Sequence, residues 1–355
     1  MSTATPIRVL VADDSAFMRT ALTRMIASDP DLCVVGTAFD GEDAVAKASA
    51  LDPDVVTLDI QMPRVDGLEA LRRIMTSRPR PVVIVSSLAE RDADATLTAL
   101  ANGAFECILK QTGVDSLDID HLRDELVMTI KAAASSARGA VDPALRKPVR
   151  SVPELASAAL APALVSIGAS TGGPRALEGI LPTLPSDLGV PVLIVQHMPR
   201  GFTNPFAKRL DKICQVRVRE AEQGDDLLAG VVYLAPAGKH MTVRRITHSG
   251  GKIMLSSDPQ GQAHVPSVDV LMLSAAVEYG SHAMGIILTG MGSDGTEGMK
   301  AIHQKGGFTI GQDEGSCVVY GMPRACALAG CLRHVLPLEE IPNQILFATR
   351  YRKRA

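Results

Sequence analysis

Residues 165–174 read VSIGASTGGP, so that an apolar run leads directly into a glycine-rich turn and then into a proline. Pro174 suits the first turn of a helix, because proline fixes φ near the helical value and the N–H that it lacks is not needed there. A strand that passes through a tight turn into a helix is the unit of α/β folds. The segment therefore predicts an α/β fold for this part of the chain.

The same alternation of short apolar runs and helical stretches continues on both sides of this segment. Before it, the runs rich in Val, Ile and Leu cover 7–12, 33–38, 54–58, 81–86 and 104–109. From the segment onward they cover 163–167, 191–196, 231–235, 284–289 and 307–311. Such alternation is typical of parallel sheets flanked by helices, so we expect a doubly wound N-terminal domain and a mostly parallel C-terminal α/β domain.

The pattern is interrupted once, between Ser135 and Ala161, by a stretch rich in Ala, Ser, Pro and Arg that has no stable period. Such composition is typical of a linker. We therefore expect a first domain over 1–130, a linker over 131–161 and a second domain over 162–355.

Composition narrows the class of protein. The chain has 355 residues and 46% hydrophobic content, enough for two domains with cores. Its 36 basic and 39 acidic residues give no general attraction to nucleic acid or to an anionic membrane. The six cysteines form no CxxC pair, which favours reduced thiols. Without a signal-peptide core or a run of about 18 apolar residues, we expect a cytoplasmic protein that does not insert into membranes.

The first domain carries polar residues where its predicted strands end. Asp13 and Asp14 follow the first strand and Asp59 follows the third, so three carboxylates are expected in one crevice. Mg²⁺ suits such a cluster, and a carboxylate can accept a phosphoryl group as an acyl phosphate. Ser86 and Lys110 end the next two strands, where a hydroxyl and an ammonium could bind phosphate oxygens. Taken singly, the same residues could be helix caps, turn residues or exposed charges.

These motifs, DD at 13–14, DIQMPRVDGLE at 59–69, VSS at 85–87 and LK at 109–110, resemble those of the response-regulator receiver domain. The resemblance implies a flavodoxin-like fold, phosphorylation of Asp59 by a histidine kinase, Mg²⁺ bound by Asp13, Asp14 and Asp59, and signalling through Ser86 and Lys110. Receivers usually have a proline after the lysine, whereas this chain has Gln111. We therefore expect the loop after Lys110 to differ.

The second domain places three further residues of complementary chemistry at strand ends. Ser170 lies in the GASTG turn, His197 follows the strand PVLIVQ, and Asp294 lies in TGMGSDG after the strand MGIILT. A serine nucleophile needs a base and a group that orients the base, and these three types could meet at one edge of the sheet. A phosphate-binding loop is disfavoured by the missing Lys-Ser/Thr pair. A structural role for the histidine alone remains an alternative.

A dinucleotide site is a second alternative, because 290–295 reads GMGSDG and matches GxGxxG after a strand. Asp294 would place a negative charge where a pyrophosphate should bind. The remaining chain is also too short for a second nucleotide-binding half. Both points disfavour this alternative.

The strings GASTGGP, QHMP, HVPSVDVL and TGMGSDG, in this order, resemble the catalytic domain of chemotaxis protein-glutamate methylesterases over about 160–350. The resemblance implies that Ser170 is the nucleophile, His197 the general base and acid, and Asp294 the group that orients the histidine. It also implies that the backbone N–H of Met291 binds the oxyanion and that Thr171 supports the histidine. It implies no cofactor for the esterase.

The expected activity is hydrolysis of glutamate methyl esters on methyl-accepting chemotaxis receptors, with deamidation of receptor glutamines by the same steps. We expect the unphosphorylated receiver to block the esterase and phosphorylation of Asp59 to release it. The competing hypothesis is a response regulator without enzymatic activity whose output domain binds nucleic acid or protein. A compact basic helix-turn-helix region is absent from the second half, which disfavours a nucleic-acid partner.

Overall fold

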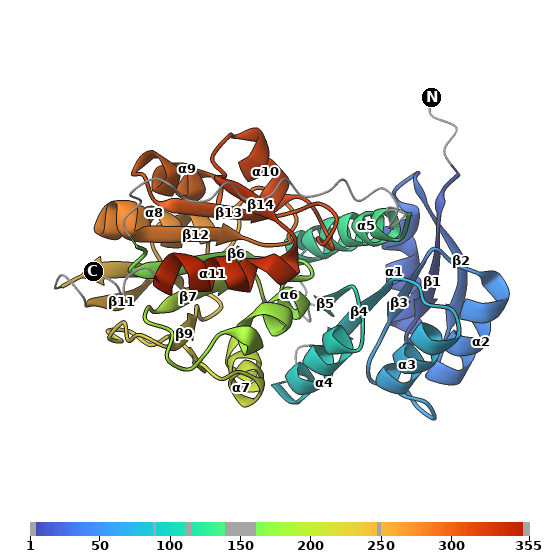
Figure 1. Ribbon diagram of the computed structural model, residues 1–355. Helices are drawn as coiled ribbons and strands as arrows, with labels where there is room; N and C mark the ends of the chain where they lie inside the picture. Colours follow the sequence, from blue (N-terminus) through green and yellow to red (C-terminus); the bar gives the residue numbers. More distant parts are fainter. Residues whose placement is uncertain (1–4, 88–89, 111–115, 139–160, 247–249, 351–355) are drawn as a thin grey trace. The chain divides into compact units, whose positions relative to one another are not determined.

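The computed structural model describes residues 5–87, 90–110, 116–138, 161–246 and 250–350. The chain divides into two compact units, Met1–Ala140 and Val141–Ala355, and each unit is built around a sheet with helices (Figure 1). Most of the expected linker lies outside the described residues, as does Gln111.

The first unit has five parallel strands in the order β2-β1-β3-β4-β5. The strands are β1 (Ile7–Ala12), β2 (Leu32–Ala38), β3 (Val55–Leu58), β4 (Val82–Ser87) and β5 (Glu106–Lys110). The helices are α1 (Ala16–Ala27), α2 (Gly41–Leu51), α3 (Gly67–Ser77), α4 (Glu90–Ala101) and α5 (Ser116–Arg138). The order confirms the doubly wound fold, and the direction of winding reverses between β1 and β3.

The central strands of this unit are apolar throughout rather than alternating, since helices cover both faces of the sheet. The residues of β3 and most of those of β1 are fully buried. The helices begin where short polar side chains cap them: Ser15 accepts a hydrogen bond from the N–H of Met18, and Asp40 from that of Asp43. The local sequence thus fixes the start of each helix just after a strand end.

Helix α5 extends through residues that we expected in the linker. It continues to Arg138, beyond the boundary expected at 130. Alanines favour helix, and Ile130, Ala133 and Ala134 are buried against the rest of the unit. The Ala- and Ser-rich composition that indicated a linker here belongs to the end of a packed helix.

The second unit contains seven parallel strands in the order β14-β13-β12-β6-β7-β9-β8. They are β6 (Leu164–Ala169), β7 (Val192–Gln196), β8 (Arg217–Glu220), β9 (Val231–Leu234), β12 (Ala283–Ile287), β13 (Phe308–Gln312) and β14 (His334–Leu336). A separate antiparallel pair is formed by β10 (His240–Arg245) and β11 (Gly251–Ser256). The α/β class is confirmed.

Four strands were not expected from the sequence. The edge strands β8 and β14 are short and include charged or exposed positions. Strands β10 and β11 mix buried with partly exposed residues, and β10 packs against α8 (Val268–Tyr279). A search for continuous apolar runs finds buried central strands and misses these.

The order of strands in this unit reverses between β6 and β12. Connections after β6 lead toward β7 and β8 through α6 (Gly173–Ile180) and α7 (Thr203–Ile213), whereas the connection after β12 leads the opposite way to β13 through α9 (Thr296–Gln304). Because such crossovers are right-handed, opposite directions put their helices on opposite faces (Figure 1). Ligands bind in α/β sheets at the carboxyl ends of the strands beside such a reversal.

Candidate active site

Ser170 and His197 lie side by side at the carboxyl ends of neighbouring strands. Ala169 of β6 pairs with Gln196 of β7, and Ser170 and His197 are the residues that follow. The N–H of His197 donates a hydrogen bond of 3.1 Å to the carbonyl of Ala169, which continues the ladder past the strand end. The expectation that a hydroxyl and an imidazole share this edge of the sheet agrees with the structure.

The turn that carries Ser170 depends on glycines. Gly172 has a φ of +76° and directly precedes α6, and Pro174 occupies the first turn, as the sequence indicated. On the other side, a Cβ on Gly290 would lie 2.8 Å from the Cβ of Ser170 and 3.1 Å from its backbone nitrogen. The loop that follows β12 therefore packs directly against Ser170, at a distance that only glycine permits.

Asp294 comes from this loop and contacts His197. The Asp294 Oδ2 atom lies 2.8 Å from the Nε2 atom of His197, and the two side chains are 12% and 9% exposed. Ser267 caps α8 and donates its hydroxyl to Asp294 at 2.9 Å. The backbone N–H groups of Val268 and Asp269 donate to the same carboxylate at 2.7 and 2.9 Å. The start of α8 thus holds the carboxylate that contacts the histidine.

These contacts set the charge of Asp294. Burial raises its pKa, but hydrogen bonds from His197 and from the N–H groups of Asp269 and Val268 outweigh burial and lower the pKa to about 2. An ionised carboxylate only accepts hydrogen bonds, so the Nε2 atom of His197 carries a proton. In the neutral ring the lone pair is then on Nδ1, which is buried and makes no hydrogen bond among the described residues. His197 therefore presents Nδ1 as its basic atom.

The structure shows where Thr171 and Met291 lie, but no contact tests their expected roles, which stay predictions. Thr171 is buried beside Ser170, and its carbonyl accepts a hydrogen bond of 2.9 Å from the hydroxyl of Thr289. Among the described residues, its own hydroxyl forms no hydrogen bond with His197. Met291 follows Gly290 on the loop that packs against Ser170. That position suits a donor to an oxyanion.

Gln196 is a contributor to the site that the sequence did not reveal. Its side-chain nitrogen donates to the carbonyl of Ser170 at 3.0 Å and to that of His197 at 2.9 Å. The side chain is 2% exposed and occupies the space that a Cβ on Gly173 would need. The last residue of β7 therefore ties the two loops together. A polar residue at the end of an apolar strand, directly before His197, was the available signal.

His264 is a second contributor that the sequence did not reveal. Its ring stacks on that of His197, with centroids 4.1 Å apart and an angle of 20° between the planes. His264 is exposed, so it lies on the solvent side of His197. The motif HVPSVDVL thus contributes twice, since its first residue, His264, packs on the imidazole and its middle residues, Ser267 to Asp269, bind the carboxylate.

In the first unit, the five expected residues also gather at the strand ends. Asp13, Asp14 and Asp59 each place a carboxylate oxygen within 4.8 Å of the others. The Lys110 Nζ atom lies 2.5 Å from Asp59 and 2.7 Å from Asp13. Ser86 is buried nearby in β4, and its hydroxyl has no hydrogen-bond partner among the described residues. The reversal between β1 and β3 is where Asp13 and Asp59 meet.

The ionisation of this cluster reflects burial and charge. Burial raises the pKa of Asp59, and the neighbouring Asp13 adds to that rise, while Lys110 opposes it. Burial lowers the pKa of Lys110, but its bonds to Asp13 and Asp59 prevail and the net direction is upward. The lysine thus stays charged between two acids.

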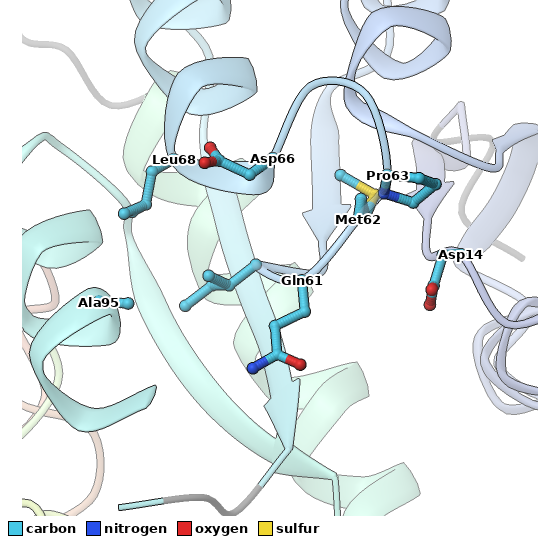
Figure 2. Close-up of a pocket in the computed structure, with 8 residues that line it drawn as sticks. Asp14, Gln61, Met62, Pro63, Asp66, Leu68 and Ala95 are labelled. Atoms are coloured by element: carbon cyan, nitrogen blue, oxygen red, sulfur yellow. The ribbon is translucent and has the colours of Figure 1, made fainter. Parts of the chain in front are cut away.

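A pocket of about 530 Å³ adjoins Asp14. Figure 2 shows Asp14 and Ala95 on opposite sides of this pocket, with the side chain of Gln61 between them. Asp66 and Leu68, at the start of α3, close another side. Asp14 is thus the member of the acidic cluster that lines this pocket.

Each half of the chain matches a known protein family. Residues 165–345 match the family model described as CheB methylesterase, and residues 9–120 match the response regulator receiver domain. A protein-glutamate methylesterase/protein-glutamine glutaminase of Symbiobacterium thermophilum is 47% identical over 96% of both chains. One from Oleidesulfovibrio alaskensis is 44% identical over 96% of this chain and 99% of its own. This chain belongs to the CheB methylesterase family.

A solved structure supports the fold of the CheB methylesterase unit. The Thermotoga maritima CheB methylesterase catalytic domain is 38% identical, with a TM-score of 0.51 over 53% of this chain and 99% of that one. The resemblance noted from the strings GASTGGP, QHMP, HVPSVDVL and TGMGSDG is thereby confirmed. None of the described helices of this CheB-family chain has the length and hydrophobicity to cross a membrane.

Proposed function

We propose that this chain hydrolyses glutamate γ-methyl esters on chemoreceptors and deamidates receptor glutamines. The observation that carries the proposal is the contact between His197 and the ionised Asp294 at the strand end adjoining Ser170. The names of the full-length relatives support the substrate class.

The reaction proposed is acyl transfer through Ser170. The Ser170 hydroxyl oxygen attacks the ester carbonyl carbon while Nδ1 of His197 takes the hydroxyl proton. Asp294 stabilises the ring, which is then positively charged and keeps its Nε2 proton. The N–H of Met291 is proposed to bind the oxyanion, and Thr171 to support the ring.

The intermediate then collapses as the C–O bond to the methoxy group breaks, and the proton on Nδ1 leaves with that oxygen as methanol. Water then attacks the carbonyl carbon of the acyl-enzyme and gives one proton to Nδ1. The ester bond to Ser170 breaks as the Ser170 oxygen takes that proton, and the glutamic acid side chain that is formed releases its remaining proton to solvent. A glutamine side chain follows the same steps with ammonia as the leaving group.

For the first unit, we propose phosphorylation of Asp59 by a histidine kinase. Three carboxylates converge here on the single ammonium of Lys110, so the cluster has room for the charge of a divalent metal ion. Asp13, Asp14 and Asp59 would hold Mg²⁺. When bound, the ion would offset the charge of the carboxylates and of the phosphoryl group. Lys110 and Ser86 are proposed to bind phosphate oxygens, because the lysine is charged and the serine hydroxyl has no other partner among the described residues.

We further propose that the unphosphorylated receiver restricts access to Ser170 and that phosphorylation relieves the restriction. Covalent linkage gives a weak inhibitory interface a high effective concentration. The absence of a membrane-crossing helix among the described residues is compatible with the proposed place of action, the cytoplasm, where chemoreceptor and kinase would be met.

A methanol-release assay on methylated receptor tests the proposal. The full-length chain should release methanol. Ser170→Ala should release none, although its unfolding temperature should equal that of the wild type. Asp59→Asn should lose activation by a phosphodonor. Methanol release by the folded alanine variant at the wild-type rate would show that Ser170 is not the nucleophile.

A further inference from the structure

Arg200 carries a charge at the rim of the proposed active site that the esterase mechanism does not use. It follows His197 by three positions, in the sequence HMPR. Its guanidinium packs against the backbone of Gly238, where a Cβ would lie 2.6 Å from Nε and Cζ and 2.8 Å from Nη2. Gly238 also has a φ of +88°. A glycine at 238 therefore serves two needs, the backbone turn and the space for the guanidinium.

Two contacts connect this guanidinium to the mouth of the site. The N–H of Gly238 donates to the carbonyl of Val265 at 2.9 Å. The preceding residue, His264, is exposed and stacks on the ring of His197. Arg200 thus packs against a residue that bonds the segment carrying His264, which lies on the solvent side of His197. We expect a substrate side chain to enter from this side.

The charge of Arg200 is available to a ligand. Arg200 is exposed and takes part in none of the hydrogen bonds or ion pairs found among the described residues. Lys239, beside Gly238, is exposed and likewise forms no ion pair within the described part of the chain. Glu220 accepts a hydrogen bond of 2.5 Å from the hydroxyl of Thr203, which in turn accepts the N–H of Ala237, next to Gly238.

We propose that Arg200, assisted by Lys239, binds a carboxylate of the substrate protein close to the reacting ester. A guanidinium offers a planar pair of donors that matches a carboxylate, and packing on Gly238 reduces the freedom that binding must remove. The proposal rests on the proposed esterase activity and adds to it a preference for acidic sequence around the ester. Hydrolysis at one site creates a carboxylate, so a neighbouring site of the same substrate becomes a better ligand.

The size of the effect follows from the exposure of Arg200. Ion pairs at exposed positions contribute up to about 1 kcal/mol, which corresponds to about a fivefold change in affinity. The pair forms with bound substrate before and during the reaction, so removing it should raise KM and leave kcat unchanged.

Two peptides distinguish this role from a structural one. Both contain a glutamate γ-methyl ester, flanked by glutamates in the acidic peptide and by glutamines in the neutral peptide. In the full-length chain, Arg200→Ala should raise KM for the acidic peptide about fivefold and leave the neutral peptide unaffected. Arg200→Lys keeps the charge but not the planar pair of donors, so its KM for the acidic peptide should lie between those of the wild type and of Arg200→Ala. High salt should reduce the wild-type preference for the acidic peptide.

Arg217→Ala is the matched control. Arg217 is exposed, forms no ion pair among the described residues, and begins β8, at the amino edge of the same sheet. This variant should hydrolyse both peptides as the wild type does. An equal loss on both peptides in Arg200→Ala, or no loss on either, would overturn the role of Arg200. A wild-type chain that hydrolyses neither peptide nor methylated receptor would instead overturn the esterase activity itself.

Discussion

The side-chain amide of Gln196 donates a hydrogen bond of 3.0 Å to the backbone carbonyl of Ser170, and the same nitrogen lies 2.9 Å from the carbonyl of His197. One buried side chain thus fixes the loop of the proposed nucleophile relative to the loop of the proposed base. The carbonyl of Ser170 also accepts the N–H of Gly173 at 2.8 Å, so the amide of Gln196 adds a second hydrogen bond to that acceptor.

Gln196→Leu should lower kcat by about 10- to 100-fold, because a displacement of about 1 Å between reacting groups costs up to that much. Gln196→Glu should be at least as severe, since a carboxylate cannot donate to two carbonyls. Methanol release measures the rate, and thermal unfolding followed by circular dichroism verifies the fold. Wild-type kcat in a folded leucine variant would contradict the positioning role.

Gly290→Ala should reduce esterase activity at least tenfold, because the new methyl group would clash with the Met322 sulfur and lie 2.8 Å from the Cβ of Ser170, which would displace the turn. Gly189→Ala is the matched control, since a Cβ at 189 meets no atom within 4 Å. Both variants are assayed for methanol release. Equal activities in Gly290→Ala and Gly189→Ala would show that the close packing on Ser170 does not affect catalysis.

Asp294→Asn should lower kcat by about 10⁴-fold, because the amide no longer fixes the tautomer of His197. The variant should also change the acid dependence of stability. The folded-state pKa of Asp294, about 2, lies below its usual value near 3.8. The stabilisation of about 2 kcal/mol is therefore present above pH 4 and is lost as pH falls toward 2.

Unfolding free energies of wild type and Asp294→Asn, measured from pH 6 to pH 2, test the second part. Their difference should be constant above about pH 5 and shrink as the pH falls below 4. A difference that stays constant down to pH 2 would mean that Asp294 is not held ionised by its neighbours.

His264→Ala should lower kcat severalfold, because it uncovers the ring face of His197. His264→Phe keeps a flat ring at that position and should recover most of the activity if stacking is what matters, since such contacts contribute about 0.5–1.5 kcal/mol. Rates of both variants across pH 5–9 provide the measurement. Equal losses in the two variants would exclude stacking as the reason.

Lys110→Met should destabilise the first unit by about 3–5 kcal/mol, because it leaves Asp13 and Asp59 buried without their shared cation. Adding Asp59→Asn should recover part of the loss by removing one of the two charges. Mg²⁺ should raise the unfolding temperature of Lys110→Met, provided that Asp13, Asp14 and Asp59 bind the ion. Calorimetry with and without EDTA provides the comparison.

The sequence predicted those features that depend on local chemistry at strand ends. Ser170, His197 and Asp294 each follow an apolar run, and parallel strands bring such positions to one edge. Gln196 and His264 were missed for a physical reason. The role of Gln196 depends on two carbonyls whose direction is set only by the folded turns, and that of His264 on the packing of a loop over a neighbouring strand.

The fold too was predicted only in part: the central strands were found, and weaker patterns were missed. Buried central strands such as β6 and β7 are visible in the sequence as continuous apolar runs. In β10 and β11 apolar residues stand among charged ones, so their hydrophobic pattern is weaker. Helix α5 was underestimated at its end, because Ala133 and Ala134 have side chains too small to mark a buried face by hydropathy.

Val268, at the start of α8, is enclosed by two glycines that are far from it in the sequence. A Cβ on Gly168 would lie 2.9 Å from its Cγ2 atom, and one on Gly295 would lie 2.8 Å from its Cγ1 atom. Its backbone N–H also binds Asp294. A bulkier residue at 168 therefore requires a smaller one at 268. Among relatives of this chain, residues 168 and 268 should therefore covary in size, whereas position 295 should stay glycine because its φ is +96°. A statistical survey of aligned sequences would reveal both patterns.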